Sequence, residues 1–197
     1  MDAPEIERLL AFLRAAEALK NVTRTSWTSS GQRESVAEHS WRLCLMALVF
    51  QHHFPEVDFA RLLKICIVHD LGEAVGGDIS AVVQAERQAD SAGGTWRKSE
   101  QERTDLLQLL TPLPDPLQRE IVSLWEEYES ATSPEARLAK GLDKLETILQ
   151  HNQGANPAGF DYRFNLAYGR QYTADDPVLA AVRAVLDEET EGRAEKS

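Results

Sequence analysis

The sequence predicts an all-α protein, and three observations lead to this fold class. Apolar residues recur three and four positions apart along most of the chain, as on the buried face of a helix. Capping residues precede several of these segments, and no stretch shows the strict alternation of a half-buried strand. The 197 residues contain no repeat or dividing linker, so we expect one domain over residues 1–190 and a disordered acidic tail at 191–197.

Composition excludes two classes of partner. The net charge of −11 argues against a broad basic surface for nucleic-acid polymers, whereas a metal ion and an arginine can still form a local site for a small phosphate. No apolar run approaches the roughly 20 residues that cross a bilayer, and the acidic N-terminus does not resemble a signal peptide. Cys44 and Cys66 lie in apolar helical patterns, which is typical of buried thiols. We therefore expect a cytoplasmic protein that binds no membrane.

The first helix is predicted over residues 3–20. Asp2 can cap its N-terminus, and Pro4 is tolerated in the first turn because its missing N–H would have no helical partner there. The apolar residues that share one face are Ile6, Leu9, Leu10, Leu13 and Ala16.

Residues 21–34 lose this pattern and are rich in Thr, Ser and Gly, so we expect a loop. Loops carry binding and catalytic residues more often than the elements they connect. Arg24, Trp27 and Arg33 stand out in this segment. Trp27 is equally consistent with a packing lid and with a platform for a ligand.

The next helix is predicted to run to about His53. Ser35 and Glu38 form a capping box, with the N-cap serine three residues before the glutamate. Glu38 therefore has a structural role. The expected core positions are Trp41, Leu45, Leu48 and Val49. His39 lies in the first turn, where a histidine that packs or hydrogen bonds is the alternative to a ligand.

A histidine and an aspartate, His69 and Asp70, stand side by side at the end of a strongly apolar helix predicted over 59–72. Such a pair is costly to bury unless something binds it, and a divalent metal ion is the simplest partner. A capped helix end is the alternative. Two more acids follow, Glu73 and Asp78, with two glycines between them that allow a tight turn.

The remaining predicted helices cover residues 79–90, 95–110, 116–129, 134 to about 151, and 176–189. Residues 152–175 are expected to form a long loop. The helix that begins at Pro134 carries a leucine stripe at Leu138, Leu142, Leu145 and Leu149. Asp143 borders this stripe, where a carboxylate either pairs with a basic residue or binds a metal ion.

These histidines and acids resemble the HD-domain metal-dependent phosphohydrolases, and most closely their 5′-deoxynucleotidase branch. Residues 69–78, HDLGEAVGGD, are similar to that branch's His-Asp-x-x-Glu-x-x-x-Gly-Asp pattern. Residues 33–40, RESVAEHS, look like its first-histidine motif, and residues 143–146, DKLE, look like its last-aspartate motif. The likeness covers roughly residues 5–150. It implies an all-α, single-domain HD fold.

The resemblance also assigns roles. The residues that it implies bind one divalent ion, of Mn, Co, Fe, Zn or Mg, are His39, His69, Asp70 and Asp143. It implies that Glu73 and Asp78 assist the attacking water and the leaving group. Arg24 lies where the family's phosphate-binding arginine is expected, and Trp27 is the nearest tryptophan for substrate contact. Family members are usually dimers, so a homodimer is expected.

The activity implied is removal of the 5′-phosphate from a (deoxy)nucleoside monophosphate by a metal-activated water, which makes the chain a phosphoric monoester hydrolase. No histidine stands between His69 and His151, which favours one metal ion over two. Two alternatives stay open. The fold can serve as a non-catalytic nucleotide-binding or regulatory module, or the substrate can be another small phosphate ester.

Overall fold

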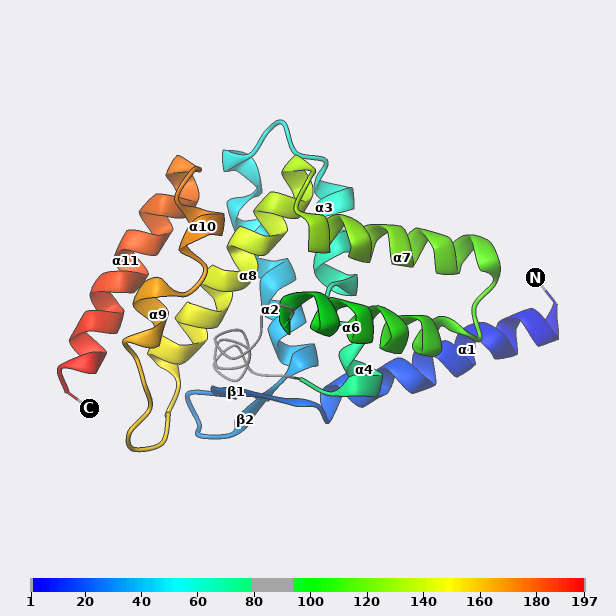
Figure 1. Ribbon diagram of the computed structural model, residues 1–197, viewed down its shortest axis with the longest axis horizontal. Coiled ribbons are helices and arrows are strands. Elements are labelled where there is room, and N and C mark those ends of the chain that lie inside the picture. The colour runs from blue at the N-terminus through cyan, green and yellow to red at the C-terminus, as the bar shows by residue number, and fades with distance from the viewer. Residues whose placement is uncertain (1, 79–93, 197) are drawn as a thin grey trace.

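The computed structural model describes residues 2–78 and 94–196, and these form a helical protein with one small hairpin (Figure 1). The predicted all-α class is therefore confirmed. The short helix expected at 79–90 lies outside the described residues. Within the described ranges, no helix combines the length and the apolar character that a membrane span requires.

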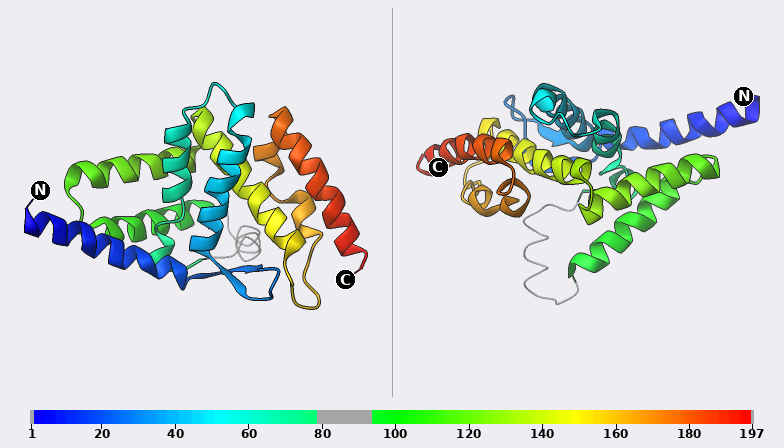
Figure 2. Two further views of the ribbon diagram at one scale, coloured as in Figure 1. Left: turned by 180° about the vertical axis from the view of Figure 1, so that it is seen from behind. Right: turned by 90° about the horizontal axis from the view of Figure 1, so that it is seen from above.

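Helix α1, Ala3–Ala16, continues into a 3₁₀ turn at Glu17–Lys20, so the first predicted helix is confirmed. The Asp2 carboxylate accepts a hydrogen bond from the backbone N–H of Glu5, as expected of an N-cap. The helix projects from the rest of the protein beside α6 (Figures 1 and 2). All of its residues keep some exposure, because only part of its apolar face meets the other helices.

Residues 21–34 do not form the simple loop that we expected. Strands β1, Thr23–Trp27, and β2, Arg33–Ser35, pair as an antiparallel hairpin. Strands of five and three residues are too short for an alternating pattern to stand out, and their register is irregular. Packing of β1 on α8 and of β2 on α2 supplies the stabilisation that an isolated hairpin lacks.

Helix α2, Val36–Phe50, is followed by a 3₁₀ turn at Gln51–His53, and its predicted capping box is present. The predicted core face is wrong. The side chains that we expected in the core, Trp41, Leu45, Leu48 and Val49, are exposed, with Trp41 at 66%. The buried face instead carries Val36, His39, Leu43, Met46 and Ala47. Because α2 is apolar on both faces, periodicity alone cannot tell which face meets the core.

Helix α3, Phe59–Val68, is capped by Asp58 and ends one residue before His69. After a tight turn, the short helix α4, Glu73–Gly76, packs on α6, Gly94–Leu110. Helices α6 and α7, Asp115–Ser130, pack together on one flank (Figure 1). These bounds agree with the predicted helices to within about two residues, except that α3 is shorter than 59–72.

Helix α8, Pro134–Gln153, runs diagonally through the centre, and α2, α3, α7 and α11 pack around it (Figure 1). Ser133 caps it by accepting a hydrogen bond from Ala136 N–H. Helix α11, Pro177–Ala194, runs past its predicted end near Glu189. It approaches α8 closely at Gly141, where a Cβ would meet Leu179 and Tyr172.

The segment expected to be a long loop, 152–175, contains two one-turn helices, α9, Phe164–Ala167, and α10, Arg170–Thr173. Both lie between α8 and α11 in sequence and contact these helices, α9 meeting α8 through the hydrogen bond between Asn165 and His151. Helices of a single turn are too short to produce a periodic pattern, so the sequence could not show them.

Candidate metal centre

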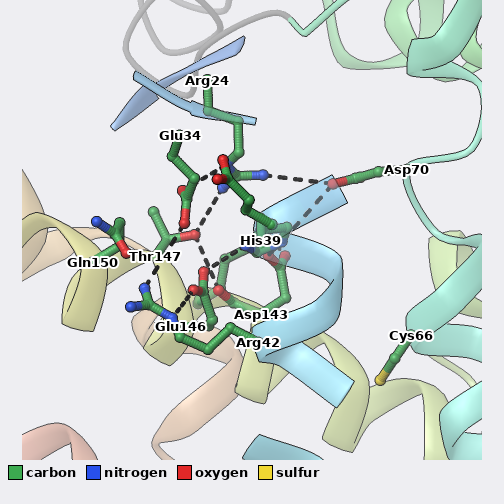
Figure 3. Close-up of polar contacts among 12 residues, drawn as sticks. Arg24, Glu34, His39, Arg42, Cys66, Asp70, Asp143, Glu146, Thr147 and Gln150 are labelled. Carbon is green, nitrogen blue, oxygen red and sulfur yellow. Dashed lines mark hydrogen bonds and ion pairs between the residues drawn. The ribbon is translucent and has the colours of Figure 1, made fainter. Parts of the chain in front are cut away.

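The structure brings together all four residues expected to bind a metal ion. His39 comes from the first turn of α2, His69 and Asp70 follow the end of α3, and Asp143 comes from the middle of α8. His39 Nε2 lies 3.2 Å from Asp143 Oδ1 and 3.8 Å from Asp70 Oδ2. His69 Nε2 lies 3.0 Å from the same Asp70 oxygen. Figure 3 shows His39, Asp70 and Asp143 facing one another.

This cluster of four residues is largely buried but keeps one edge accessible to solvent. The side chain of His39 is fully buried and that of His69 is almost so, whereas Asp70 keeps 19% of its side-chain surface. Asp143 is 6% exposed. The exposed edge of the cluster is therefore at Asp70, which is where a small ligand from solvent would reach it.

Both imidazole rings are oriented by a hydrogen bond at Nδ1. The backbone carbonyl of Cys66 lies 2.9 Å from His69 Nδ1, and the Glu146 carboxylate contacts His39 Nδ1. A carbonyl or carboxylate oxygen can only accept, so Nδ1 carries the proton in each ring. In the neutral rings, the lone pairs of both Nε2 atoms therefore point toward the two aspartates. This arrangement is typical of histidines that bind a metal through Nε2.

A divalent cation fits these residues. The Nε2 atoms of His39 and His69 are buried, and among the described residues neither has a hydrogen-bond partner of acceptable geometry. Each instead faces a carboxylate oxygen at 3.0–3.2 Å. Two nitrogen lone pairs beside two carboxylates repel unless a proton or a metal cation lies between them. Two imidazoles and two carboxylates suit several divalent ions and do not select one of them.

The carboxylate of Asp143 is fixed by hydrogen bonds to Oδ2, the oxygen that does not face His39. Its Oδ2 accepts hydrogen bonds from Tyr128 Oη at 2.7 Å and from Lys144 Nζ at 2.8 Å. Burial alone would raise the pKa of Asp143, but the charge of Lys144 and the contacts with the two histidines hold it well below its usual range. The sequence left pairing and metal binding as alternatives for this carboxylate, and its two oxygens allow both.

Arg24 reaches the exposed edge of the cluster from strand β1. Its three guanidinium nitrogens face three different groups: Nε lies 3.5 Å from Glu34, Nη1 lies 3.5 Å from Asp70, and Nη2 donates to Thr147 at 3.0 Å. Figure 3 shows these contacts. Although burial disfavours its charge, the nearby carboxylates, Asp70 foremost, raise the pKa of Arg24 further. The side chain is a fixed cation beside the candidate metal ligands.

The two acids expected to assist the reaction follow the His69-Asp70 doublet along the chain. Glu73 is the first residue of α4, one turn after the doublet, and is buried. The chain then turns at Gly77, whose φ of +76° favours glycine, and brings Asp78 near enough for its charge to raise the pKa of Arg24. Asp78 therefore lies near Arg24, and Glu73 is held in a buried position one turn after the doublet.

Trp27 lies at the end of β1, and its ring is already in contact with protein groups. The Arg33 guanidinium lies over the ring at 4.8 Å from its centroid, and Phe160 meets it edge-on at 6.1 Å. The backbone carbonyl of Trp27 accepts a hydrogen bond from Gln150. These contacts fix the hairpin against α8 and the following loop, which is the packing role that the sequence left open.

Sequence reasoning missed a layer of residues around the cluster. Glu34 and Thr147 contact Arg24, and Glu146 contacts His39. Arg42 contacts Glu34 and Glu146, and no role was expected for any of these four residues. Glu34, His39 and Glu146 even form a second group of potential metal ligands. Glu146 follows Asp143 by three residues and so shares its helix face, which was the available signal.

The fold and this site define a class of protein, an all-α protein with a buried two-histidine, two-aspartate centre that fits a divalent metal ion. The HD domain family matches residues 16–183 of the chain. The chain belongs to this family. Membership together with the cluster implies a divalent metal ion as cofactor.

Curated relatives support a finer placement within the family. The chain is 37% identical over 150 residues to "5'-deoxynucleotidase HDDC2" of Danio rerio, covering 75% of this chain and 70% of that protein. It is 36% identical over 147 residues to the Homo sapiens protein of the same name, covering 74% and 67%. A solved structure from Magnetospirillum magnetotacticum, described as a "Predicted metal-dependent phosphohydrolase", superposes with a TM-score of 0.77 at 26% identity and covers 95% of this chain and 96% of that one.

Proposed function

We propose that the chain is a phosphoric monoester hydrolase that removes the 5′-phosphate from nucleoside monophosphates, with deoxynucleotides preferred. The observation that carries the proposal is the buried pair of histidines and pair of aspartates with Arg24 beside their exposed edge. The relatives named 5′-deoxynucleotidase support the substrate class.

The residues of the chain divide the chemistry between them. His39, His69, Asp70 and Asp143 would hold the divalent ion. When bound, such an ion lowers the pKa of water and polarises a phosphoryl group. Arg24 presents a planar guanidinium to the same place, and its N–H groups can bind two phosphate oxygens at once.

Two acids remain for proton transfer. We assign Glu73, one turn after the doublet, to accept a proton from the attacking water, and Asp78, whose charge acts on Arg24, to assist the leaving oxygen. We also propose that Trp27 contacts the substrate, in addition to its packing against Arg33 and Phe160. We assign no metal, because mixed nitrogen and oxygen ligands suit Mn²⁺, Co²⁺, Fe²⁺, Zn²⁺ and Mg²⁺.

The test is phosphate release from a panel of substrates by protein that has been stripped and then loaded with Mn²⁺, Co²⁺ or Mg²⁺. The panel contains deoxynucleoside and ribonucleoside 5′-monophosphates, their 3′ isomers, and a simple phosphate monoester. We expect the deoxy 5′ series to be cleaved fastest. Equal cleavage of every ester would instead indicate an unselective phosphatase, and metal binding without any cleavage would indicate a regulatory module.

We also propose that a second copy of the chain covers the outer face of α2. This face carries four exposed apolar side chains: Trp41, Leu45, Leu48 and Val49. The two charged residues of α2 are engaged within the chain, Glu38 by Ser35 and Arg42 by Glu146. Two molecules of net charge −11 can therefore meet along this face without direct charge repulsion.

Replacing Trp41 with glutamate should convert the dimer to a monomer. Across a two-fold axis the new carboxylates of the two copies would face each other and repel. Light scattering after size-exclusion chromatography measures the mass. Val185→Glu is the matched control, since Val185 is an equally exposed apolar residue on α11. A wild-type protein that is monomeric at micromolar concentration, or a Trp41→Glu variant that stays dimeric, would refute this assignment.

We place the protein in the cytoplasm. Cys44 and Cys66 are both free thiols in the structure, and Cys66 is buried in the core. Free thiols are the normal state in a reducing compartment, so this observation supports the proposal.

A further inference from the structure

One carboxylate, that of Glu146, joins two residues of α2 to the central helix α8. Its Oε2 lies 2.5 Å from His39 Nδ1, and its Oε1 accepts a hydrogen bond from Arg42 Nε at 2.6 Å. His39 and Arg42 are three residues apart on α2 and therefore share a face. Figure 3 shows Glu146 between them. Both of its oxygens are used, and its side chain is fully buried.

The two histidines of the centre are supported differently. His69 Nδ1 meets the carbonyl oxygen of Cys66, a neutral acceptor. His39 Nδ1 meets the Glu146 carboxylate, which also pairs with the Arg42 guanidinium. A hydrogen bond to a charged acceptor is roughly twice as strong as one to a neutral acceptor. It also makes the imidazole a better electron donor at Nε2.

Arg42 compensates the buried negative charge of Glu146. A buried carboxylate that touches only an imidazole would be costly, because its charge would lack a cation. Arg42 supplies that cation, and its planar guanidinium fixes the carboxylate plane through Nε. Its Nη2 also lies 3.9 Å from Glu34, the neighbour of Arg24 within the same charge network.

We infer that Glu146, held by Arg42, is a positioning residue for the metal centre: it fixes the ring of His39 with Nε2 toward the aspartates and strengthens that nitrogen as a ligand. The inference rests on the proposed metal site but not on the nucleotide reaction, so the ion alone can test it. A Glu146 that served only to join α2 to α8 would stabilise the fold and leave metal affinity unchanged.

The experiment measures the dissociation constant of Co²⁺ for the stripped protein by calorimetric titration, together with the visible absorption spectrum of the bound ion. Glu146→Gln keeps the shape of the side chain but removes its charge. We expect its affinity for Co²⁺ to fall by roughly 10- to 100-fold, the usual effect of losing such a partner. The absorption bands should also shift, because the ligand strength of His39 changes.

Glu135→Gln is the matched control. Glu135 is a buried glutamate of the same helix, but it accepts a hydrogen bond from the backbone of Asp58 and does not touch the cluster. It should bind Co²⁺ as the wild type does. Arg42→Met, which removes the cation and leaves the carboxylate, should weaken binding by a smaller factor. If Glu146→Gln does not fold, the Co²⁺ affinity of Arg42→Met tests the inference in its place.

Three outcomes are distinguishable. Weaker binding and a shifted spectrum in Glu146→Gln, with Glu135→Gln unchanged, support the inference. If Glu146→Gln and Arg42→Met both bind Co²⁺ with the affinity and spectrum of the wild type, the inference is overturned. This holds even if the two variants melt at a lower temperature in the presence of a chelator. A wild-type protein that binds no Co²⁺ at all would overturn the proposed metal centre, and the inference with it.

Discussion

Replacing Asp70 with asparagine should lower the rate of phosphate release by more than about 100-fold, since losing even an outer partner of a metal site costs roughly 10- to 100-fold. One oxygen of Asp70 lies near both histidines, at 3.0 Å from His69 Nε2 and 3.8 Å from His39 Nε2. Asparagine keeps the shape of this side chain, but it is a neutral and weaker ligand. Rates with saturating Mn²⁺ and the Mn²⁺ dissociation constant measure the effect.

Asp187→Asn is the control for this substitution. Asp187 pairs with Arg170 and Arg183, as Asp70 pairs with Arg24. Its replacement therefore also removes a carboxylate that faces an arginine, but one that does not belong to the cluster. This variant should keep wild-type activity and metal affinity. An Asp70→Asn variant that folds, binds Mn²⁺ and hydrolyses nucleotides at the wild-type rate would show that the reaction takes place elsewhere.

Replacing Arg24 with glutamine should lower kcat/KM by roughly 10²- to 10³-fold, the usual effect of removing a donor that stabilises transition-state charge. The guanidinium lies 3.5 Å from Asp70 at the exposed edge, where a phosphate would approach. Both kcat and KM should change, because the same guanidinium binds the substrate phosphate and stabilises the charge that develops on it in the transition state. Metal affinity should change little, which separates this variant from Asp70→Asn.

Two further variants sharpen this comparison. Arg24→Lys keeps the charge but not the planar fork, so its activity should be intermediate. Arg61→Gln removes an arginine that pairs with Glu127 and should leave kinetics unchanged. If Arg24→Gln changed stability alone, with kcat and KM at wild-type values, Arg24 would be only a structural partner of Asp70 and Thr147.

The helices could be predicted because their ends carry local signals. Asp2 and Ser35 each cap the helix that the sequence assigned to them, and Asp58 and Ser133 cap α3 and α8 in the same way. Caps act through hydrogen bonds within three residues, so they do not depend on the rest of the fold. The hairpin could not be predicted in the same way, because its short strands are stabilised by contacts with α2 and α8.

The core face of α2 shows the limit of periodicity. Trp41 and Leu43 are both apolar, yet Trp41 is exposed and Leu43 is buried. The face that meets the core is the one that carries His39, and this choice depends on how α3 and α8 pack against it. Such tertiary contacts leave no trace in the spacing of apolar residues.

The residues that meet in the cluster could be predicted, whereas the residues that support them could not. His69 and Asp70 attract notice because a charged pair at the end of an apolar helix needs a partner. Glu146, in contrast, stands next to Leu145 in a helix where an isolated glutamate normally faces solvent. Its burial follows from its contacts with His39 and Arg42, which come from a distant part of the chain.

The most direct test of the central claim is the position of the ion, measured by anomalous diffraction from crystals of the protein loaded with one equivalent of Mn²⁺. We expect one peak per chain, within direct coordination distance of Nε2 of His39 and His69 and of carboxylate oxygens of Asp70 and Asp143. A peak at the neighbouring group of Glu34, His39 and Glu146, or at a site without His69 and Asp70, would contradict the account.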